Sequence, residues 1–317
     1  MATSSYPTQT GQQTTTTQAV FVPQLWSNEV KASFECRLVL ADLVKQIDFQ
    51  GRSGDTMHIP APLRGASSAF SEGNSVTLQN NTEGEIQVVV DQHFEYTRLI
   101  SDRADIQGLE TQKSFYVDDA GYQLSKTIDT TLMNLGKSVG DGDGSSWVHS
   151  ASNYCDASTG LTAFATDTVT SSDNFTDACF RQIIQAQDDV DVPFDNRALV
   201  IPPSVKNQIM GIDRYVSSDF VAGQGVQNGK IGELYGIPIF VSSNCPTIET
   251  ASDNSAGGAV KAATLLHQDS YILAMQSAIR TQQSYKQEYL ANMTTSDVLF
   301  GTKVYRADTV QILAVNG

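Results

Sequence analysis

Apolar residues recur at intervals of three and four between residues 102 and 137, which is the strongest periodic pattern in the chain. The positions that share this spacing are Val117, Ala120, Leu124, Ile128, Leu132 and Leu135. Such spacing places the apolar side chains on one face of an α-helix. Asp102 and Asp105 favour a helix start, and Gly136 favours its end. We therefore predict one long amphipathic helix, about 45 Å long if it runs from Asp105 to Leu135 at about 1.5 Å per residue.

Two extended segments precede this helix, and we predict that they form one long hairpin. Residues 54–62 favour an outgoing strand and residues 85–97 a return strand, in which apolar and polar side chains alternate. About twenty residues rich in Ser, Asn, Gly and Thr separate them, too many for a tight turn. A loop of this length is uncommon inside a compact domain, so we expect it to act outside the domain.

From residue 172 onward, helical and strand patterns alternate. We predict a helix that is capped by Asp173 and ends near Asp189, then a buried strand at 198–201. Pro202 and Pro203 favour the first turn of a second helix, because a proline is tolerated there. This succession indicates an α/β unit.

Residues 225–244, GVQNGKIGELYGIPIFVSSN, join a glycine-rich turn to an uninterrupted apolar run. The run Ile237–Val241 predicts a short strand buried on both faces. Pro238 cannot donate to a ladder, so we expect it at the strand's start or at a sheet edge. Four further strands are predicted from apolar runs in the tail, at residues 265–266, 271–274, 298–301 and 311–315.

The 225–244 segment resembles a signature of the major capsid proteins of tailed bacteriophages, which have the Hong Kong ninety-seven type of shell fold. That signature reads Gly, hydrophobic, Gly, Ile/Val-Pro-Ile/Val, hydrophobic, Ser. The order of elements over roughly residues 20–317 is also similar to that family. The resemblance implies an α+β phage capsid fold with five parts: an N-terminal arm (1–49), an extended β-hairpin loop (50–98), a peripheral domain with a long spine helix and an insert (99–174), an α/β axial domain (175–260) and closing strands of the peripheral domain (261–317).

The function implied by the resemblance is structural and not enzymatic. Copies of the chain are expected to form pentamers and hexamers of an icosahedral head that encloses double-stranded DNA in the virion. The implied partners are further copies of the chain, a separate scaffolding protein, the portal and a cement or decoration protein. Residues expected to contact neighbouring subunits are Phe21, Trp26, Arg64, Phe70, Val76, Leu78, Tyr215 and Phe220.

Three alternatives stay open. An encapsulin-like compartment that encloses a protein cargo has the same fold. The other two are an α/β enzyme and a monomeric binding module, which would form no large particle. We expect no fused scaffolding domain, because the hairpin begins within about sixty residues of the first residue.

The formal net charge of −15 argues against binding nucleic acid through lysines and arginines. It also suits a wall that must not adhere to packaged DNA, because like charges repel. Residues 1–19 are almost entirely Thr, Gln, Ser and Gly, so we expect a tail or an arm that orders on a neighbouring subunit. No apolar run is long enough to cross a membrane.

The sequence nominates no catalytic, cofactor-binding or metal-binding residues. The four histidines are isolated, and the four cysteines have no paired spacing, so we expect free thiols. Residues 141–152 begin like a calcium loop, but they lack both the glycine at position six and the closing glutamate. A Gly-Asp turn is favoured there.

Overall fold

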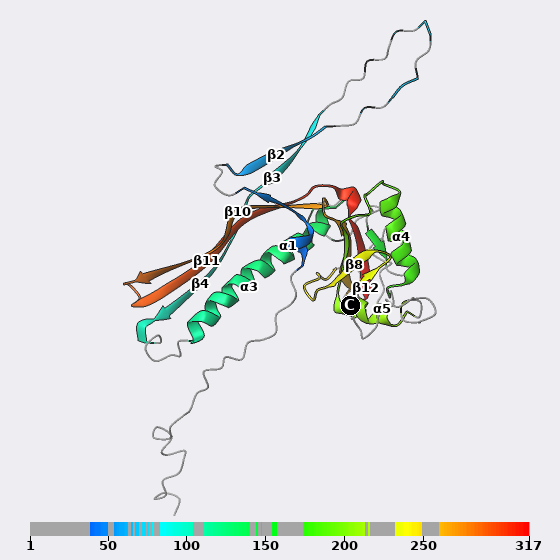
Figure 1. Cartoon of the computed structure of the whole chain (residues 1–317). Coiled ribbons are helices and arrows are strands. Elements are labelled where there is room, and N and C mark those ends of the chain that lie inside the picture. Colours follow the sequence, from blue (N-terminus) through cyan, green and yellow to red (C-terminus); the bar gives the residue numbers. More distant parts are fainter. Residues whose placement is uncertain are drawn as a thin grey trace, which may run out of the picture.

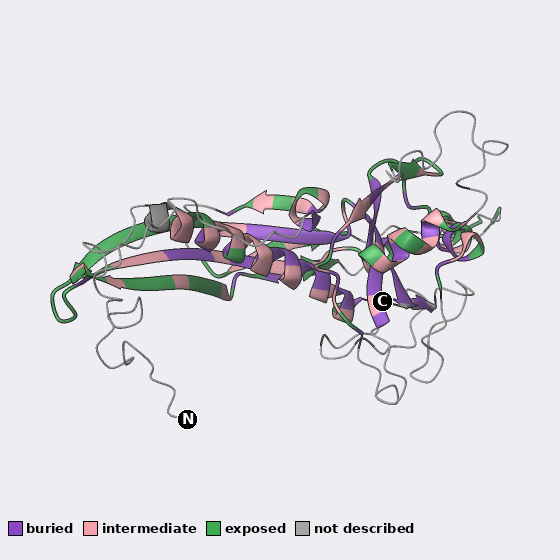
Figure 2. Ribbon diagram, turned by 90° about the horizontal axis from the view of Figure 1, so that it is seen from below, coloured by how far each residue is buried: buried purple, intermediate pink, exposed green. Residues whose placement is uncertain are grey.

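The computed structural model describes residues 39–49, 54–62, 83–103, 111–139, 174–212, 232–248 and 260–316, with short pieces at 65, 67–69, 72–73, 75, 78, 144, 147, 154–156 and 215. A slender lobe of long strands and one long helix joins an α/β lobe, and a hairpin projects from their junction (Figure 1). Burial is concentrated where the lobes meet and decreases toward the far end of the long strands (Figure 2).

The slender lobe is built on a four-stranded sheet of order β1-β10-β11-β4. Its strands are β1 (Lys45–Asp48), β4 (Gln92–Ser101), β10 (Tyr271–Lys286) and β11 (Ala291–Val304). The helix α3 (Thr111–Asn134) lies along one face, continues into a 3₁₀ turn (Leu135–Ser138), and contacts the short helix α1 (Leu40–Leu43). The long helix is thus confirmed, with Leu124, Ile128 and Leu132 of its stripe buried. Its described course begins at Thr111, and Asp105 lies outside the described residues.

The α/β lobe contains a six-stranded sheet of order β5-β12-β9-β6-β8-β7. Its strands are β5 (Tyr154–Asp156), β6 (Arg197–Ile201), β7 (Glu233–Leu234), β8 (Ile237–Val241), β9 (Val260–His267) and β12 (Gln311–Asn316). The helices α4 (Asp177–Asp188) and α5 (Pro203–Met210) belong to this lobe, and a 3₁₀ turn (Ala307–Thr309) precedes β12. Thr176 caps α4 by accepting a hydrogen bond from the Cys179 amide, so the predicted cap at Asp173 is wrong.

Strands in the middle of this sheet are covered on both faces, which explains why they read as continuous apolar runs. In β12, Ile312 and Ala314 face the core that contains α3, whereas Leu313 and Val315 face the core beneath α4 and α5. β8 differs from the prediction, because Ile237 and Ile239 are buried but its other residues are half-buried. Pro238 is its second residue, near the start of the strand as expected.

The tail strands were expected to close one peripheral domain, but they are divided between two sheets. β10 and β11 lie in the long sheet, whereas β9 and β12 pair with each other in the six-stranded sheet of the α/β lobe. The region 261–317 therefore contributes to both lobes.

The predicted hairpin is present, with β2 (Thr56–Ala61) antiparallel to β3 (Gly84–Val89). The predicted return strand, however, is two strands. It breaks at Val90–Asp91, after which β4 pairs with β11 in the long sheet. Residues 92–98 of the predicted hairpin region thus belong to the slender lobe.

Candidate inter-subunit surfaces

The base of the hairpin is anchored to the body by a small apolar core. Val88 and Val90 pack there with Phe49, Ile272 and Ala274. The amide of Val90 donates to the Asp55 carbonyl at 2.7 Å, and the Phe49 amide donates to the Met275 carbonyl at 3.0 Å. The hairpin therefore leaves the body from a defined position.

A glycine permits the chain to cross the long sheet at this point. A Cβ atom at Gly301 of β11 would overlap the carbonyl group of Val89 and lie 2.9 Å from the Cα atom of Val90. Real Cβ atoms essentially never approach so closely, so only glycine fits. Gly301 thus sets the depth at which the hairpin base sits on the sheet.

Beyond its base the hairpin is a two-stranded ribbon that extends away from both lobes (Figure 1). Every described residue between 62 and 83 is exposed, and Leu78 is 91% exposed. A two-stranded ribbon is at best marginally stable in water without further packing. The ribbon is therefore suited to packing against another molecule.

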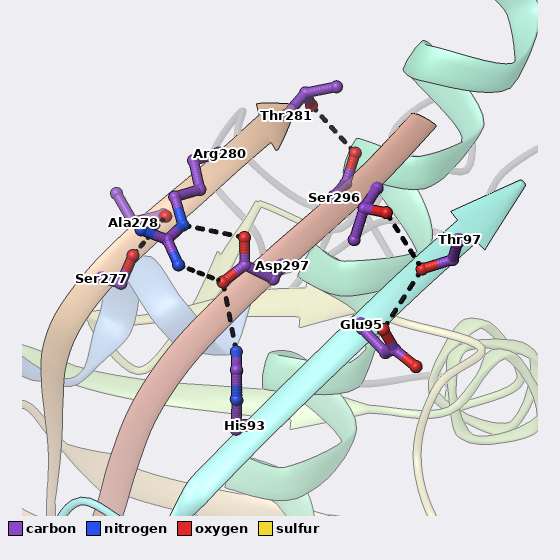
Figure 3. A network of polar contacts seen from close by, with 10 residues as sticks. His93, Glu95, Thr97, Ser277, Ala278, Arg280, Thr281, Ser296 and Asp297 are labelled. Carbon is purple, nitrogen blue, oxygen red and sulfur yellow. Dashed lines mark hydrogen bonds and ion pairs between the residues drawn. The ribbon is translucent and has the colours of Figure 1, made fainter. Parts of the chain in front are cut away.

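The face of the long sheet opposite α3 carries a cluster of charged and polar side chains that joins three strands (Figure 3). Arg280 of β10 donates two hydrogen bonds to the carboxylate of Asp297 of β11, at 2.8 and 2.9 Å. His93 of β4 approaches the same carboxylate at 3.1 Å. Asp297 is only 8% exposed because these side chains cover it. The hydrogen bonds from Arg280, and next the single one with His93, hold the pKa of Asp297 below its ordinary value.

The face of the long sheet that packs on α3 is joined to the helix by aromatic and polar contacts. The hydroxyl of Tyr96 donates to Asp119 at 2.7 Å and accepts from Arg98 Nε at 2.9 Å. The guanidinium of Arg98 also lies 4.7 Å from the centre of the Tyr116 ring. A cavity of about 150 Å³ remains between helix and sheet at this place. These contacts hold the far half of the long sheet against α3.

The far end of the slender lobe is apolar at its tip. Tyr289 and Leu290, in the turn between β10 and β11, are each 65% exposed, and Leu99 on β4 is 50% exposed. Large side chains at the end of a narrow lobe have little of their own chain to pack against. This tip is therefore a second candidate contact surface.

In the α/β lobe, Asp177 organises an aromatic cluster. The hydroxyls of Tyr215 and Tyr235 each donate to its Oδ1 atom at 2.6 Å, and Arg181 donates to Oδ2 at 3.0 Å. Burial, and then Asp177, raises the pKa of Tyr215 far above its ordinary value. Tyr215 is 5% exposed, so most of its ring is buried in the core of its own chain.

Of the eight residues expected at subunit contacts, two are described. Leu78 is free for contact, whereas Tyr215 belongs to the α/β core. The other six lie outside the described residues: Phe21, Trp26, Arg64, Phe70, Val76 and Phe220. The prediction omitted Tyr289 and Leu290, although an adjacent aromatic and aliphatic pair after the polar stretch 286–288 signals an exposed apolar turn.

The described residues offer little for chemistry. No group of three or more His, Cys, Asp or Glu residues in this part of the chain could hold a metal ion. Cys155, Cys179 and Cys245 are buried thiols that take part in no disulfide, as predicted, while Cys36 lies outside the described residues. Burial raises the pKa of Cys245 to about 12, so this thiol is a poor nucleophile at neutral pH. None of the described helices is both long and apolar enough to span a bilayer.

No protein-family profile matches the sequence, and no curated protein matches it. Solved structures, in contrast, match nearly the whole chain. The capsid structure of the cyanophage P-SCSP1u contains a chain with a TM-score of 0.71 and 17% identity, over 95% of this chain and 94% of that one. A chain from Mycobacterium phage Che8 has a TM-score of 0.69 and 18% identity, over 92% and 97% respectively.

A third match comes from the asymmetric unit of the mature capsid of bacteriophage PhiM1. It has a TM-score of 0.69 and 13% identity, over 92% of this chain and 91% of that one. The α+β capsid fold indicated by residues 225–244 is therefore confirmed: along nearly its whole length, the chain has the fold of these phage capsid chains.

Proposed function

We propose that this chain is the major capsid protein of a tailed bacteriophage and that it resides in the virion as the building block of the icosahedral head. The observation that carries the proposal is the hairpin, which is anchored at its base and otherwise extends from the body with exposed side chains. A monomeric protein gains nothing from ordering such a ribbon, because exposed residues lose conformational freedom without burying apolar surface.

Pentamers and hexamers form when the same two surfaces of each copy meet head to tail around a rotation axis. The hairpin and the apolar tip at Tyr289 and Leu290 then connect neighbours, within and between these rings. Each contact is small, but a closed lattice multiplies it. The role of the chain is mechanical, and its side chains hold positions instead of performing a reaction.

The net charge of −15 fits a shell that surrounds double-stranded DNA without binding its sequence. A scaffolding protein guides closure in this proposal, and a portal occupies one vertex. A decoration protein is a further partner for the outer surface.

Electron microscopy and analytical ultracentrifugation of the purified chain test the proposal. Expressed with a scaffolding protein from the same phage genome, the chain is expected to yield closed icosahedral particles of one diameter. Expressed alone, it is expected to yield capsomers or particles of mixed size. Uniform closed shells from the chain alone would contradict the need for a scaffold. A chain that stays monomeric at every concentration, with or without the scaffold, would contradict the shell function.

A further inference from the structure

One buried carboxylate joins three parts of the molecule that are distant in the sequence. Asp129 lies in α3 and is 1% exposed. Its Oδ1 atom accepts hydrogen bonds from the backbone amides of Val39 at 3.2 Å and Leu40 at 2.9 Å. Its Oδ2 atom accepts a hydrogen bond from the side-chain amide of Asn244 at 2.8 Å.

Asn244 is itself held from both sides. It follows β8 in the α/β lobe, and its Oδ1 atom accepts a hydrogen bond from the Thr130 hydroxyl of α3 at 3.1 Å. The backbone amide of Asn244 donates to the Ser242 hydroxyl at 3.2 Å. Two consecutive residues of α3 thus contact one turn of the α/β lobe.

This joint lies where the described part of the chain begins, at Val39. Val39 is the first described residue, so the preceding 38 residues are covalently attached at the point where Asp129 accepts the two amides. The same carboxylate sets where the end of β8 lies against α3. The position of residues 39–40 and the placement of the two lobes are therefore coupled through one side chain.

Stability alone does not explain a carboxylate at this position. The three donors that contact Asp129 are neutral, and burying a polar group has a cost that its hydrogen bonds must offset. A well-packed apolar side chain often stabilises a buried position as much or more. A carboxylate differs in requiring donors in defined directions, so it favours one arrangement of the parts around it.

We propose that Asp129 is a positioning residue for shell assembly. It fixes the position of Val39 and Leu40 against α3 and holds α3 in register with the turn after β8. This inference rests on the proposed capsid function. Subunits without the Asp129 carboxylate remain folded but hold residues 39–40 and their two lobes in more than one relative arrangement.

Hydrogen exchange in the free subunit tests the joint independently of assembly. In Asp129→Ala, the amides of Val39 and Leu40 are expected to exchange at least tenfold faster than in the wild type. The buried amide of Leu199 in β6 serves as the internal reference and is expected to keep its rate. Asp118→Ala, an exposed aspartate on the same helix, is the matched control and is expected to leave both amides protected. Unchanged exchange at Val39 and Leu40, or an equal increase at Leu199, would overturn the proposal.

A charge swap tests the link between the lobes. Asn244→Asp places a second carboxylate against Asp129, so exchange at residues 39 and 40 is expected to accelerate at least tenfold. Combining it with Asp129→Asn restores one amide and one carboxylate across the joint, since the amide introduced on α3 can donate to the carboxylate introduced after β8. The double variant is expected to return the fraction of closed particles to within about threefold of the wild type, whereas Asn244→Asp alone reduces it at least tenfold. A double variant no better than the single one contradicts the proposal.

Assembly of Asp129→Ala below its melting temperature separates positioning from stability. We expect a mixture of particle diameters and open shells from subunits with a native circular dichroism spectrum. Uniform closed shells at wild-type yield would show that the carboxylate only stabilises the fold, and would overturn the assembly role. If the wild type itself forms no shells, the proposed function fails, while the exchange measurements still decide whether Asp129 holds the joint.

Discussion

The charged cluster around Asp297 makes the stability of the slender lobe depend on pH. The pKa of Asp297 is lowered in the folded chain, mainly by Arg280, so the ionised carboxylate favours the folded state. This contribution is fully present above the unfolded pKa, about 3.9, and is lost as the pH falls through the lower folded pKa.

We therefore expect Arg280→Gln to lower the melting temperature by about one or two degrees at pH 7 and by clearly less at pH 2. Thermal unfolding followed by circular dichroism at both pH values measures this difference. Lys286→Gln, at the last residue of the same strand, is the matched control and is expected to change little at either pH. An Arg280→Gln effect of equal size at both pH values would show that the pairing with ionised Asp297 is not its cause.

Gly301 is expected to tolerate no side chain. Gly301→Ala places a methyl group on the Val89 carbonyl, so β3 or β11 must shift, at a cost of about 1–3 kcal/mol in the free energy of unfolding. Urea unfolding of the subunit measures this change. Gly121→Ala on α3 is the control, because a Cβ atom there meets nothing within 4 Å. It should be stabilising by about 0.5–1 kcal/mol, since alanine favours a helix. Equal behaviour of both variants would refute the close contact at Gly301.

At the scale of elements, the hairpin and the body are expected to behave as separate units. On the outgoing strand, the apolar core at the hairpin base extends as far as Ile59. The described residues between 62 and 83 are all exposed. Replacing residues 63–82 by an Asn-Gly turn should leave the melting temperature of the subunit within about 2 °C of the wild type, because little buried surface is lost. The same change should abolish closed particles.

Calorimetry of the subunit and electron microscopy of the assembled material together check this expectation. Leu78→Ala, which shortens one exposed side chain and keeps the ribbon, is the milder comparison and should reduce the yield of particles without abolishing them. Closed shells of normal size from the chain without the ribbon would show that the hairpin does not connect subunits.

At the scale of the whole particle, we expect subunits to be held without covalent bonds. Some members of the family that the sequence resembles join subunits by an isopeptide bond from a lysine in the extended loop to a neighbour's asparagine. This chain has no lysine between Lys45 and Lys113, so its hairpin lacks the required amine. Arg52 and Arg64 cannot replace it, because a guanidinium stays protonated and is a poor nucleophile.

Mature particles boiled in denaturant and reductant should therefore run as single chains near 34.3 kDa on a gel. Apolar contacts, strand pairing or an added cement protein then supply the strength of the shell. A ladder of multimers that survives this treatment would contradict the expectation and would also question which residues form the extended loop.

Local patterns were enough to predict the long helix and the strands of the tail. The apolar stripe from Val117 to Leu135 predicted α3, and the runs in the tail predicted the cores of β9, β10, β11 and β12. These signals are local, because burial of one face requires a fixed spacing along the chain. The 225–244 signature added the capsid fold, and with it the expectation of contacts through the hairpin.

Strand pairing and contacts between residues distant in the sequence could not be predicted from local patterns. The apolar runs in the tail do not reveal that β9 and β12 join one sheet while β10 and β11 join the other, because pairing partners are chosen across the whole chain. In the sequence, Tyr215 was assigned to a subunit contact. The structure shows that it is buried and that its hydroxyl donates a hydrogen bond to Asp177, 38 residues away. Asp129 reads as one more polar residue of a helix. It becomes a joint only when Val39 and Asn244, about 90 and 115 residues away, converge on its carboxylate.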